Sequence, residues 1–506
     1  MANTPQTLLE LLDQAPGDAT AIVLPDEGVT VSYDSLRGQV RAVADAFASA
    51  GITRTDRVAM ALPNGLPTIV CFLGASVAGT AAPLNPGYRE EEFKFYLEDT
   101  NAKLLVVPQD GGDDARRAAG DRVPVATVSS GADGRVQLST MGTSRSAEPP
   151  TGEDIALVLH TSGSTGRPKR VPLKHRNLTF SVGNIVRTYG LTADDVSMCV
   201  MPLFHVHGLV ASMLSTLATG GTVVVPPKFN PLGFWRTVRD HHVTWYSAVP
   251  TMHQLLIARV KSGEQTDIGR LRFIRSCSAA LSPETMNTME QAFRVPVLEA
   301  YGMTEASHQM SSNPLPPGPR KPGSVGHGTG VHIGIMNSEG TLLNRGEHGE
   351  IVIQGPNVIQ GYENNPEANA TSFSDGWFRT GDQGFLDPQG YLTLVARIKE
   401  LINRGGEKIS PREIDEVLMT HPAVAEAVSF GVPHRMWGEE VAAAVVLREN
   451  ADAKEADLMA YCRERLAEFK CPKKIHLTQT IPRTATGKIQ RRVVAAAYAE
   501  AADAAR

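Results

Sequence analysis

Two loops rich in small and hydroxylated residues each carry a lysine. The first lies within residues 159–175, LHTSGSTGRPKRVPLKH, where Gly163, Gly166 and Lys169 follow an apolar run. The second, IPRTATGKIQRR, places Lys488 in a Thr- and Gly-rich turn ahead of a predicted helix. Glycines allow backbone angles that other residues avoid, and backbone amides, hydroxyls and an ammonium group together suit the oxygens of a polyphosphate. Both loops are therefore candidates for binding phosphate groups.

Each loop also has a plainer interpretation. The first differs from the common P-loop, because Gly163 and Gly166 are too close together and no Ser or Thr follows Lys169. Taken singly, it fits a flexible surface turn, and Lys488 fits a solvated lysine at a helix start. Their occurrence in two predicted domains favours a joint role, in which one domain holds the phosphates and the other brings a cation to the reacting centre.

The elements that must position these loops alternate between helix and strand. Residue patterns predict helices at 35–50 and 68–79, and strands at 56–62, 81–85 and 102–108. Such alternation is typical of a mostly parallel sheet with helices on both faces. Residues 111–152 are rich in Gly, Asp, Ser and Pro, and we expect an irregular surface connection with one weak strand there.

The alternation resumes with a predicted strand at 154–160, directly before the first loop, and continues through a helix after Asn177 and a long helix after Gly208. Short β-rich segments follow at 349–355, 376–387 and 390–406. The predicted fold class is α/β. A large N-terminal domain, residues 1–396, would contain mostly parallel sheets flanked by helices, plus a β-rich subdomain.

Residues 397–506 are predicted to form a small, mobile C-terminal α+β domain. Its first helix starts with Ser410 as N-cap, Pro411 at the first helical position and Glu413 in a capping box. Two strands, a helix at about 454–469, a short strand at 473–478 and a last helix after Lys488 would complete it. The join near residues 396–401, ARIKEL, is a candidate hinge.

Composition excludes several classes of partner. The net charge of −5, from 49 basic and 54 acidic residues, does not indicate nucleic acid or an anionic membrane. The five cysteines are scattered, which is typical of reduced thiols and makes a zinc site improbable. The N-terminus lacks signal-peptide features, the longest apolar region (209–226) is interrupted by Ser, Thr and Gly, and the last residues carry no peroxisomal tripeptide. We expect a cytoplasmic protein, monomer or homodimer, without a membrane span.

Five motifs in order give the chain a family resemblance. These are TSGSTGRPK (161–169), YGMTE (301–305), RTGD (379–382), RIKELINRGGEKIS (397–410) and TATGKI (484–489). With them the sequence resembles the acyl-adenylate-forming superfamily, which includes acyl-CoA synthetases and 4-coumarate ligases. The segments MPLFHVHGL, RFIRSCSAAL and EAYGMTEASHQM are similar to the oxalate–CoA ligase group. Arg170 and Ala396 depart from the family pattern, which usually has Gly at both positions.

The resemblance implies a reaction in two halves, with ATP, Mg²⁺ and coenzyme A. A carboxylate and MgATP give an acyl-adenylate and pyrophosphate, and a thiol then displaces AMP. Positioning and cations should carry the first half, because charge spreads over the α-phosphate oxygens. The β- and γ-phosphates would be held by Thr161, Ser162, Gly163, Ser164, Thr165, Gly166 and Lys169.

Further roles follow from the same resemblance. Tyr301 would pack on adenine, Thr304 would meet the α-phosphate, and Glu305 would hold Mg²⁺. Asp382 would accept from the ribose hydroxyls, with Arg397 nearby as a donor. Lys488 would bridge the carboxylate and the α-phosphate. The plainer alternatives are a helix-start acid for Glu305, a turn residue for Asp382 and a surface side chain for Arg397.

The resemblance also implies that the small domain rotates between the two half-reactions, about a hinge at Lys399. Gly405 and Gly406 would then line the pantetheine channel, where the absence of a Cβ matters. The alternative for this glycine pair is an ordinary hairpin turn.

The acid pocket should be built from FHVHG, RSCSAAL and EASHQ, which supply an unusually polar set of side chains. This set consists of His205, His207, Arg275, Ser276, Ser278 and His308. A pocket with unmade hydrogen bonds rejects an apolar ligand by roughly 10⁴-fold, whereas a second carboxylate would satisfy it. The resemblance indicates His207, Ser278 and His308 as contacts to the distal carboxylate of oxalate. Several alternatives stay open. His205 could be a gate, and Arg275 could pair with an acid elsewhere. The substrate could be malonate, a medium-chain fatty acid or an aromatic acid.

Two other classes of function fit the sequence less well. A P-loop ATPase or kinase would need the missing Ser or Thr after the loop lysine. A non-catalytic nucleotide-binding protein would be expected to lack Glu305 or Lys488, and both are present.

Overall fold

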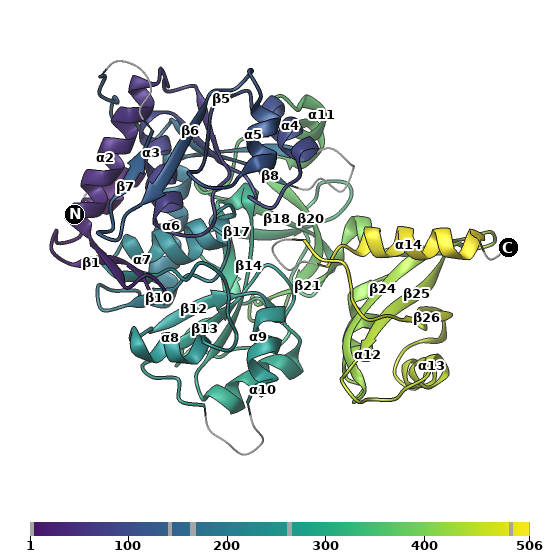
Figure 1. Cartoon of the computed structure of the whole chain (residues 1–506). Coiled ribbons are helices and arrows are strands. Elements are labelled where there is room, and N and C mark those ends of the chain that lie inside the picture. The colour runs from purple at the N-terminus through teal and green to yellow at the C-terminus, as the bar shows by residue number, and fades with distance from the viewer. Residues whose placement is uncertain (1–4, 140–143, 162–167, 261–265, 485–488, 505–506) are drawn as a thin grey trace.

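A computed structural model describes residues 5–139, 144–161, 168–260, 266–484 and 489–504. The predicted phosphate contacts Ser162, Gly163, Ser164, Thr165 and Gly166, and the predicted catalytic Lys488, lie outside the described residues. Four sheets organise the chain (Figure 1).

The first sheet has seven strands in the order β7-β6-β5-β3-β4-β8-β9. Their bounds are β3 Arg57–Met60, β4 Thr80–Pro83, β5 Ala102–Pro108, β6 Val125–Ser130, β7 Val136–Leu138, β8 Ile155–Thr161 and β9 Lys169–Lys174. The inner strands pair in parallel, and only β7 and β9 are antiparallel to their neighbours. The helices that accompany this sheet are α2 Tyr33–Ser49, α3 Leu66–Ala78, α4 Glu90–Asp99 and α5 Asp113–Ala119. The predicted alternation from residue 35 to 108 is confirmed.

The region predicted as an irregular connection, residues 111–152, instead contains α5, β6 and β7. That prediction was wrong. The reason is that alternate residues of β6, Ala126 and Val128, are buried when the strand pairs with β5, and local composition does not reveal this pairing.

The second sheet has nine strands in the order β16-β15-β14-β13-β12-β10-β11-β1-β2. Their bounds are β1 Thr20–Leu24, β2 Val29–Ser32, β10 Val196–Met198, β11 Thr222–Val224, β12 Trp245–Ala248, β13 Phe273–Ser276, β14 Val297–Met303, β15 His308–Ser312 and β16 His327–Gly328. The helices around it are α1 Leu8–Leu12, α6 His175–Tyr189, a π-helix at His207–Leu214, α7 Ser215–Leu217, α8 Phe234–Asp240, α9 Pro250–Ile257 and α10 Pro283–Phe293. The helix predicted after Gly208 is thus of the π type, which occurs often at functional sites.

Three hydrophobic cores stack the helices and the two sheets into layers. Helices α2, α3, α6 and the π-helix share one core with the facing sides of both sheets. Helices α4 and α5 cover the outer side of the first sheet, and α8, α9 and α10 cover the outer side of the second. Strand alternation produces this division: in β5, Leu104 and Val106 face the central core, while Leu105 and Val107 face α4 and α5.

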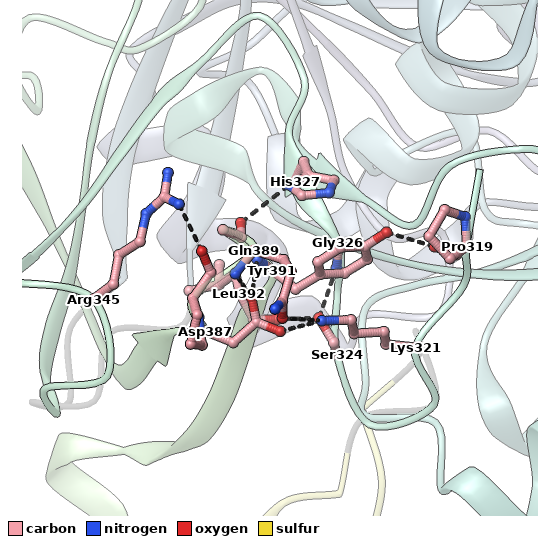
Figure 2. A network of polar contacts seen from close by, with 12 residues as sticks. Pro319, Lys321, Ser324, Gly326, His327, Arg345, Asp387, Gln389, Tyr391 and Leu392 are labelled. Atoms are coloured by element: carbon pink, nitrogen blue, oxygen red, sulfur yellow. Dashed lines mark hydrogen bonds and ion pairs between the residues drawn. The ribbon is translucent and has the colours of Figure 1, made fainter.

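The third sheet is antiparallel and confirms the predicted β-rich region. It contains β17 His332–Met336, β18 Gly349–Gln354, β19 Phe373–Ser374, β20 Trp377–Leu386 and β21 Leu392–Arg397, with helix α11 Pro366–Ser372 beside it. Figure 2 shows how the β20–β21 turn is fixed: Lys321 contacts Asp387, Tyr391 Oη donates to the carbonyl oxygen of Pro319 at 2.6 Å, and Ser324 Oγ donates to the carbonyl oxygen of Leu392 at 2.7 Å. The hairpin is therefore tied to the segment that leads into β16.

The fourth sheet has the order β23-β22-β25-β24, with β26 beside β25, and projects from the rest of the molecule (Figure 1). Its elements are β22 Ile402–Arg404, β23 Glu407–Ile409, α12 Pro411–Met419, β24 Val424–His434, β25 Gly438–Leu447, α13 Glu455–Arg463, β26 Lys474–Leu477 and α14 Arg491–Ala504. They bury their own cores. Helix α13 ends at Arg463, earlier than predicted.

Helix α12 begins at Pro411 with Ser410 as N-cap, as predicted, but the capping box does not form. Ser410 Oγ donates to the carbonyl oxygen of Val395 at 2.8 Å, and Glu413 pairs with Lys470. The hydroxyl thus connects α12 to β21 rather than closing the helix end. A boundary at residue 396 stays a prediction, and Arg397 is the last residue of β21.

Candidate active site

The two strands β8 and β9 bring the ends of the first loop together. Thr161 ends β8, Lys169 begins β9, and the two residues are direct partners in the antiparallel ladder. The loop between them therefore starts and ends at one place, at the edge of the first sheet.

Beside this loop, Tyr362 lies between two of the predicted site residues. Its Oη donates to Oε1 of buried Glu305 at 2.8 Å, and the Lys169 ammonium lies 4.4 Å from the centroid of its ring. Burial lowers the pKa of Lys169, the Glu305 carboxylate opposes this effect, and the charge of Lys399 adds to it. Glu305, Lys169 and the predicted hinge residue Lys399 thus belong to one electrostatic cluster. Sequence reasoning missed Tyr362.

A second group connects Tyr301, Asp382 and Arg397. Tyr301 Oη donates to Asp382 Oδ2 at 2.5 Å, while Arg397 Nε and Nη2 lie 2.8 and 3.2 Å from Oδ1 and Oδ2 of the same carboxylate. The Asp382 charge raises the pKa of Arg397, and burial followed by the same charge raises that of Tyr301. The hairpin of the third sheet places Asp382 and Arg397 opposite each other in register. Arg397 is a surface side chain, 47% exposed, as in the plainer interpretation, and it also makes a two-point ion pair with Asp382.

Thr304 begins a 3₁₀ turn that carries Glu305, directly after β14 and its Tyr301. The motif YGMTE therefore places its tyrosine and its acid at one end of a strand of the second sheet. The third sheet supplies Asp382 and Arg397 to the same place.

The predicted acid contacts converge on one buried group. His207 Nδ1 lies 2.9 Å from Ser278 Oγ, and the rings of His207 and His308 are 5.3 Å apart. His207 is the first residue of the π-helix, while Ser278 follows β13 and His308 begins β15. Ser278 and His308 have φ of 72° and 108°, which non-glycine residues rarely adopt. Such conformations cluster at functional sites, where the surrounding packing compensates for them.

Arg275 lies beneath these residues and is fully buried. Its Nη1 donates to Ser247 Oγ at 2.8 Å and its Nη2 to Gln309 Oε1 at 3.0 Å, while Nε donates to Tyr189 Oη at 2.9 Å. Among the described residues, no Asp or Glu lies within ion-pair distance of this guanidinium. The alternative of an acid partner for Arg275 is therefore not supported.

Gly405 and Gly406 form the two-residue turn between β22 and β23, with φ of 61° and 97°. Both residues need positive φ for this type of hairpin, so the turn alone explains why they are glycines. A Cβ on Gly405 would lie 2.9 Å from Cε3 of Trp437, whereas a Cβ on Gly406 would meet nothing within 4 Å. Lys399 lies in a 3₁₀ turn, Ile398–Glu400, between β21 and β22. The channel and hinge roles stay predictions.

Comparison with known proteins agrees with this geometry. A family model described as AMP-binding enzyme matches residues 10–363, and one described as AMP-binding enzyme C-terminal domain matches residues 413–488. The chain belongs to the AMP-binding enzyme family. This AMP-binding enzyme is 48% identical to an oxalate–CoA ligase of Arabidopsis thaliana, over 91% of this chain and 92% of that protein. It is 42% identical to an oxalate–CoA ligase of Saccharomyces cerevisiae, over 96% and 95% of the two chains.

Among solved structures, the AMP-binding enzyme superposes on ATP-bound MatB from Rhodopseudomonas palustris with a TM-score of 0.90 and 32% identity, over 98% of this chain and 99% of that one. The predicted α/β fold and the predicted enzyme class are confirmed. The protein is an AMP-forming acid–CoA ligase that uses ATP, Mg²⁺ and coenzyme A. No described helix of this AMP-binding enzyme has the length and apolarity needed to cross a membrane.

Proposed function

We propose that this enzyme activates oxalate and transfers the oxalyl group to coenzyme A. The two oxalate–CoA ligases support this, because their similarity extends over nearly all of this chain. The observation that carries the proposal is the buried guanidinium of Arg275, whose described partners are all uncharged in their usual states. A buried charge without a counter-charge is costly. The distal carboxylate of a short dicarboxylic acid would supply the missing negative charge near it.

The contacts of Arg275 also fix the protons of the two histidines. Its Nη2 lies 3.4 Å from His308 Nδ1, and a guanidinium can only donate, so the His308 proton is placed on Nε2. Arg275 Nη1 also lies 3.5 Å from His207 Nε2, so this nitrogen accepts, and Ser247 Oγ, which lies 2.6 Å from it, donates its proton there. His207 then carries its proton on Nδ1, facing Ser278 Oγ.

This arrangement favours a carboxylate over an alkyl tail. If His207 donates to Ser278 Oγ, the Ser278 hydroxyl proton can be donated to a ligand oxygen, and the Nε2–H group of His308 is a second donor. Two neutral donors above a buried cation match one carboxylate group. A medium-chain fatty acid or an aromatic acid offers these donors no oxygen at this position, which is unfavourable.

We infer the following roles at the nucleotide. Thr161, Lys169 and the loop residues Ser162, Gly163, Ser164, Thr165 and Gly166 would bind the β- and γ-phosphates. Tyr301 would pack on adenine, Thr304 would contact the α-phosphate, and Asp382 with Arg397 would bind the ribose.

Glu305 would hold Mg²⁺. Its Oε1 is oriented by Tyr362, and no cluster of three potential metal ligands occurs in the described part of the chain. A single carboxylate fits a Mg²⁺ ion that is otherwise coordinated by phosphate oxygens and water. When bound, the ion would neutralise phosphate charge.

In the first half-reaction a carboxylate oxygen of oxalate forms a bond to the α-phosphorus while pyrophosphate leaves, and Lys488 would bridge the two reacting groups. In the second, the coenzyme A sulfur attacks the oxalyl carbonyl, AMP leaves and the thiol proton passes to solvent or buffer. Rotation about Lys399 would replace Lys488 by the turn of Gly405 and Gly406.

We place the enzyme in the cytoplasm, as a monomer or homodimer.

Acid-dependent exchange of labelled pyrophosphate into ATP tests the proposal. We expect exchange with oxalate, weaker exchange with malonate, and none with hexanoate or benzoate. Mass spectrometry should then find oxalyl-CoA, AMP and pyrophosphate when coenzyme A is added. Stronger exchange with hexanoate than with oxalate, or ADP as the nucleotide product, would contradict the proposal.

A further inference from the structure

A cluster of charged side chains lies at the ends of β8 and β9 that flank residues 162–167. It consists of Arg57, Asp99, His160, Arg170 and Glu363, whose side chains are 19%, 11%, 7%, 11% and 14% exposed. These residues come from β3, the end of α4, β8, β9 and the segment after Tyr362. Five segments that are distant in sequence therefore meet at this place.

Arg170 is the centre of the cluster. Its Nη1 donates to the carbonyl oxygen of Asp99 at 2.5 Å, and its Nε lies 3.4 Å from Oδ2 of the same residue. On its other side, Nη1 lies 3.8 Å from Oε2 of Glu363. One guanidinium thus joins the end of helix α4 to the segment beyond Tyr362.

The carboxylates of the cluster have further partners. Asp99 Oδ2 lies 3.0 Å from His160 Nε2, and burial lowers the pKa of His160, so the neutral ring donates to this carboxylate. Arg57 Nη2 donates to both oxygens of Glu363, at 2.7 and 2.8 Å. The Glu363 backbone N–H also donates to the carbonyl oxygen of Arg170, at 3.2 Å.

The register of β8 and β9 connects this cluster to the loop. His160 and Arg170 are direct partners in the ladder, and the next pair is Thr161 and Lys169. Successive side chains of a strand point to opposite faces. Lys169 accordingly contacts the ring of Tyr362, while Arg170 contacts Asp99 on the side of α4.

We propose that Arg170 is a positioning residue for ATP binding, which fixes the ends of β8 and β9 so that Thr161 and Lys169 are held ready for the phosphate groups. This rests on the proposed role of the loop in binding ATP. Thr161 and Lys169 are the ladder pair next to His160 and Arg170, so the contacts of Arg170 also hold the two described residues proposed to meet phosphate, and contacts that are held in place lose less conformational freedom on binding.

Calorimetric titration of MgATP, without any acid, tests the proposal on four proteins. They are the wild type, Arg170→Gln, Arg170→Lys and the control Arg135→Gln, which removes a surface arginine whose side chain is 79% exposed. We expect Arg170→Gln to weaken ATP binding about tenfold, Arg170→Lys to weaken it less, and Arg135→Gln to have no effect. In steady-state kinetics the KM for ATP should rise, while kcat and the KM for the acid should stay nearly unchanged. The reason is that the lost interaction is present in both the ground state and the transition state.

A second pair of variants separates positioning from folding. Asp99→Asn should weaken ATP binding in the same way, and Arg170→Gln combined with Asp99→Asn should cost less than the two single effects together. Unchanged ATP affinity in folded Arg170→Gln would overturn the proposal. If Arg170→Gln does not fold, unchanged affinity in both Arg170→Lys and Asp99→Asn would overturn it. An equal rise in the KM for the acid would also overturn it. Since ATP binding is measured without acid, failure of oxalate as substrate would leave this result unaffected.

Discussion

Nη2 of Arg275 lies 3.4 Å from Nδ1 of His308, and both residues are buried. Because a guanidinium can only donate, His308 Nδ1 accepts, and a permanent cation lies directly beside this imidazole. In the proposed acid site, this relationship would place the positive charge one residue away from the ligand and give the histidine the role of donor.

Arg275→Met should reduce kcat/KM for oxalate roughly 100-fold or more, because it removes the charge and its hydrogen bonds to Ser247 and Gln309. Steady-state kinetics with oxalate would measure the change, and calorimetric titration of MgATP without acid would show whether the nucleotide site is intact. Arg270→Gln is a suitable control, since Arg270 is exposed and lies near the same strand. An equal loss of ATP affinity would mean that Arg275 has only a structural role.

Tyr362→Phe should lower the rate of acid-dependent pyrophosphate exchange by roughly 10- to 100-fold, since hydrogen bonds to charged groups contribute about 1.5–3 kcal/mol. The lost hydroxyl leaves Glu305 Oε1 without its described donor, and we expect a higher Mg²⁺ requirement. A Mg²⁺ titration of exchange measures this. Tyr461→Phe removes a comparable hydroxyl, hydrogen bonded to Thr420 in the fourth sheet's unit, and should change neither quantity. An unaltered Mg²⁺ dependence in Tyr362→Phe would count against the assignment of Glu305.

Gly406→Trp and Lys488→Ala should affect opposite half-reactions. Gly406→Trp should spare pyrophosphate exchange and block thioester formation, while Lys488→Ala should abolish exchange and spare coenzyme A transfer to preformed oxalyl-AMP. Gly406→Trp also introduces strain, because φ at this residue is 97°.

Gly346→Trp provides the matched control for that strain. Gly346 has φ of 88°, and a Cβ there would likewise meet nothing within 4 Å. Its variant should retain both half-reactions. If Gly346→Trp loses thioester formation as completely as Gly406→Trp, the effect is general destabilisation and not a blocked channel.

Glu299→Gln should flatten the dependence of stability on pH. Burial raises the pKa of Glu299 to about 7; its Oε1 accepts from the Leu281 N–H group at 2.9 Å, and its Oε2 has no hydrogen-bond partner among the residues that the structure describes. Because the folded protein holds this proton more tightly than the unfolded chain, the stabilisation is complete below the usual pKa of 4.5 and is lost as pH rises toward 7. Melting temperatures between pH 4.5 and 8 should fall more steeply for the wild type than for Glu299→Gln. Glu98 is exposed, and the control variant Glu98→Gln should keep the wild-type slope of melting temperature against pH. If Glu299→Gln also keeps this slope, Glu299 is ionised in the folded protein throughout this pH range, and the prediction is wrong.

The order of strands and helices could be predicted where local patterns are strong. The buried strand before the first loop, the β-rich segments and the strands after α12 are all present as predicted. Predictions failed where a residue had a competing partner. Ser410 has the sequence context of a capping box, yet its hydroxyl contacts Val395, 15 residues earlier in the chain.

The candidate site shows the same division. Motif residues such as Tyr301, Glu305 and Asp382 could be named in advance, because the short motifs that contain them resemble those of the acyl-adenylate-forming superfamily. Tyr362 could not, since a tyrosine after a glycine has no distinguishing pattern until it lies beside Glu305, 57 residues away in the chain.

By itself the sequence determined most of the succession of elements, the two phosphate-loop candidates and a polar set of side chains predicted to meet the acid, because these depend on residue type and on spacing within one segment. Only the tertiary structure decided which of those side chains form ion pairs or hydrogen bonds with one another. Whether Arg275 pairs with an acid, whether Arg170 connects two segments, and which nitrogen of His308 is protonated depend on neighbours brought together by packing across several strands, and spacing along the chain carries no information about them.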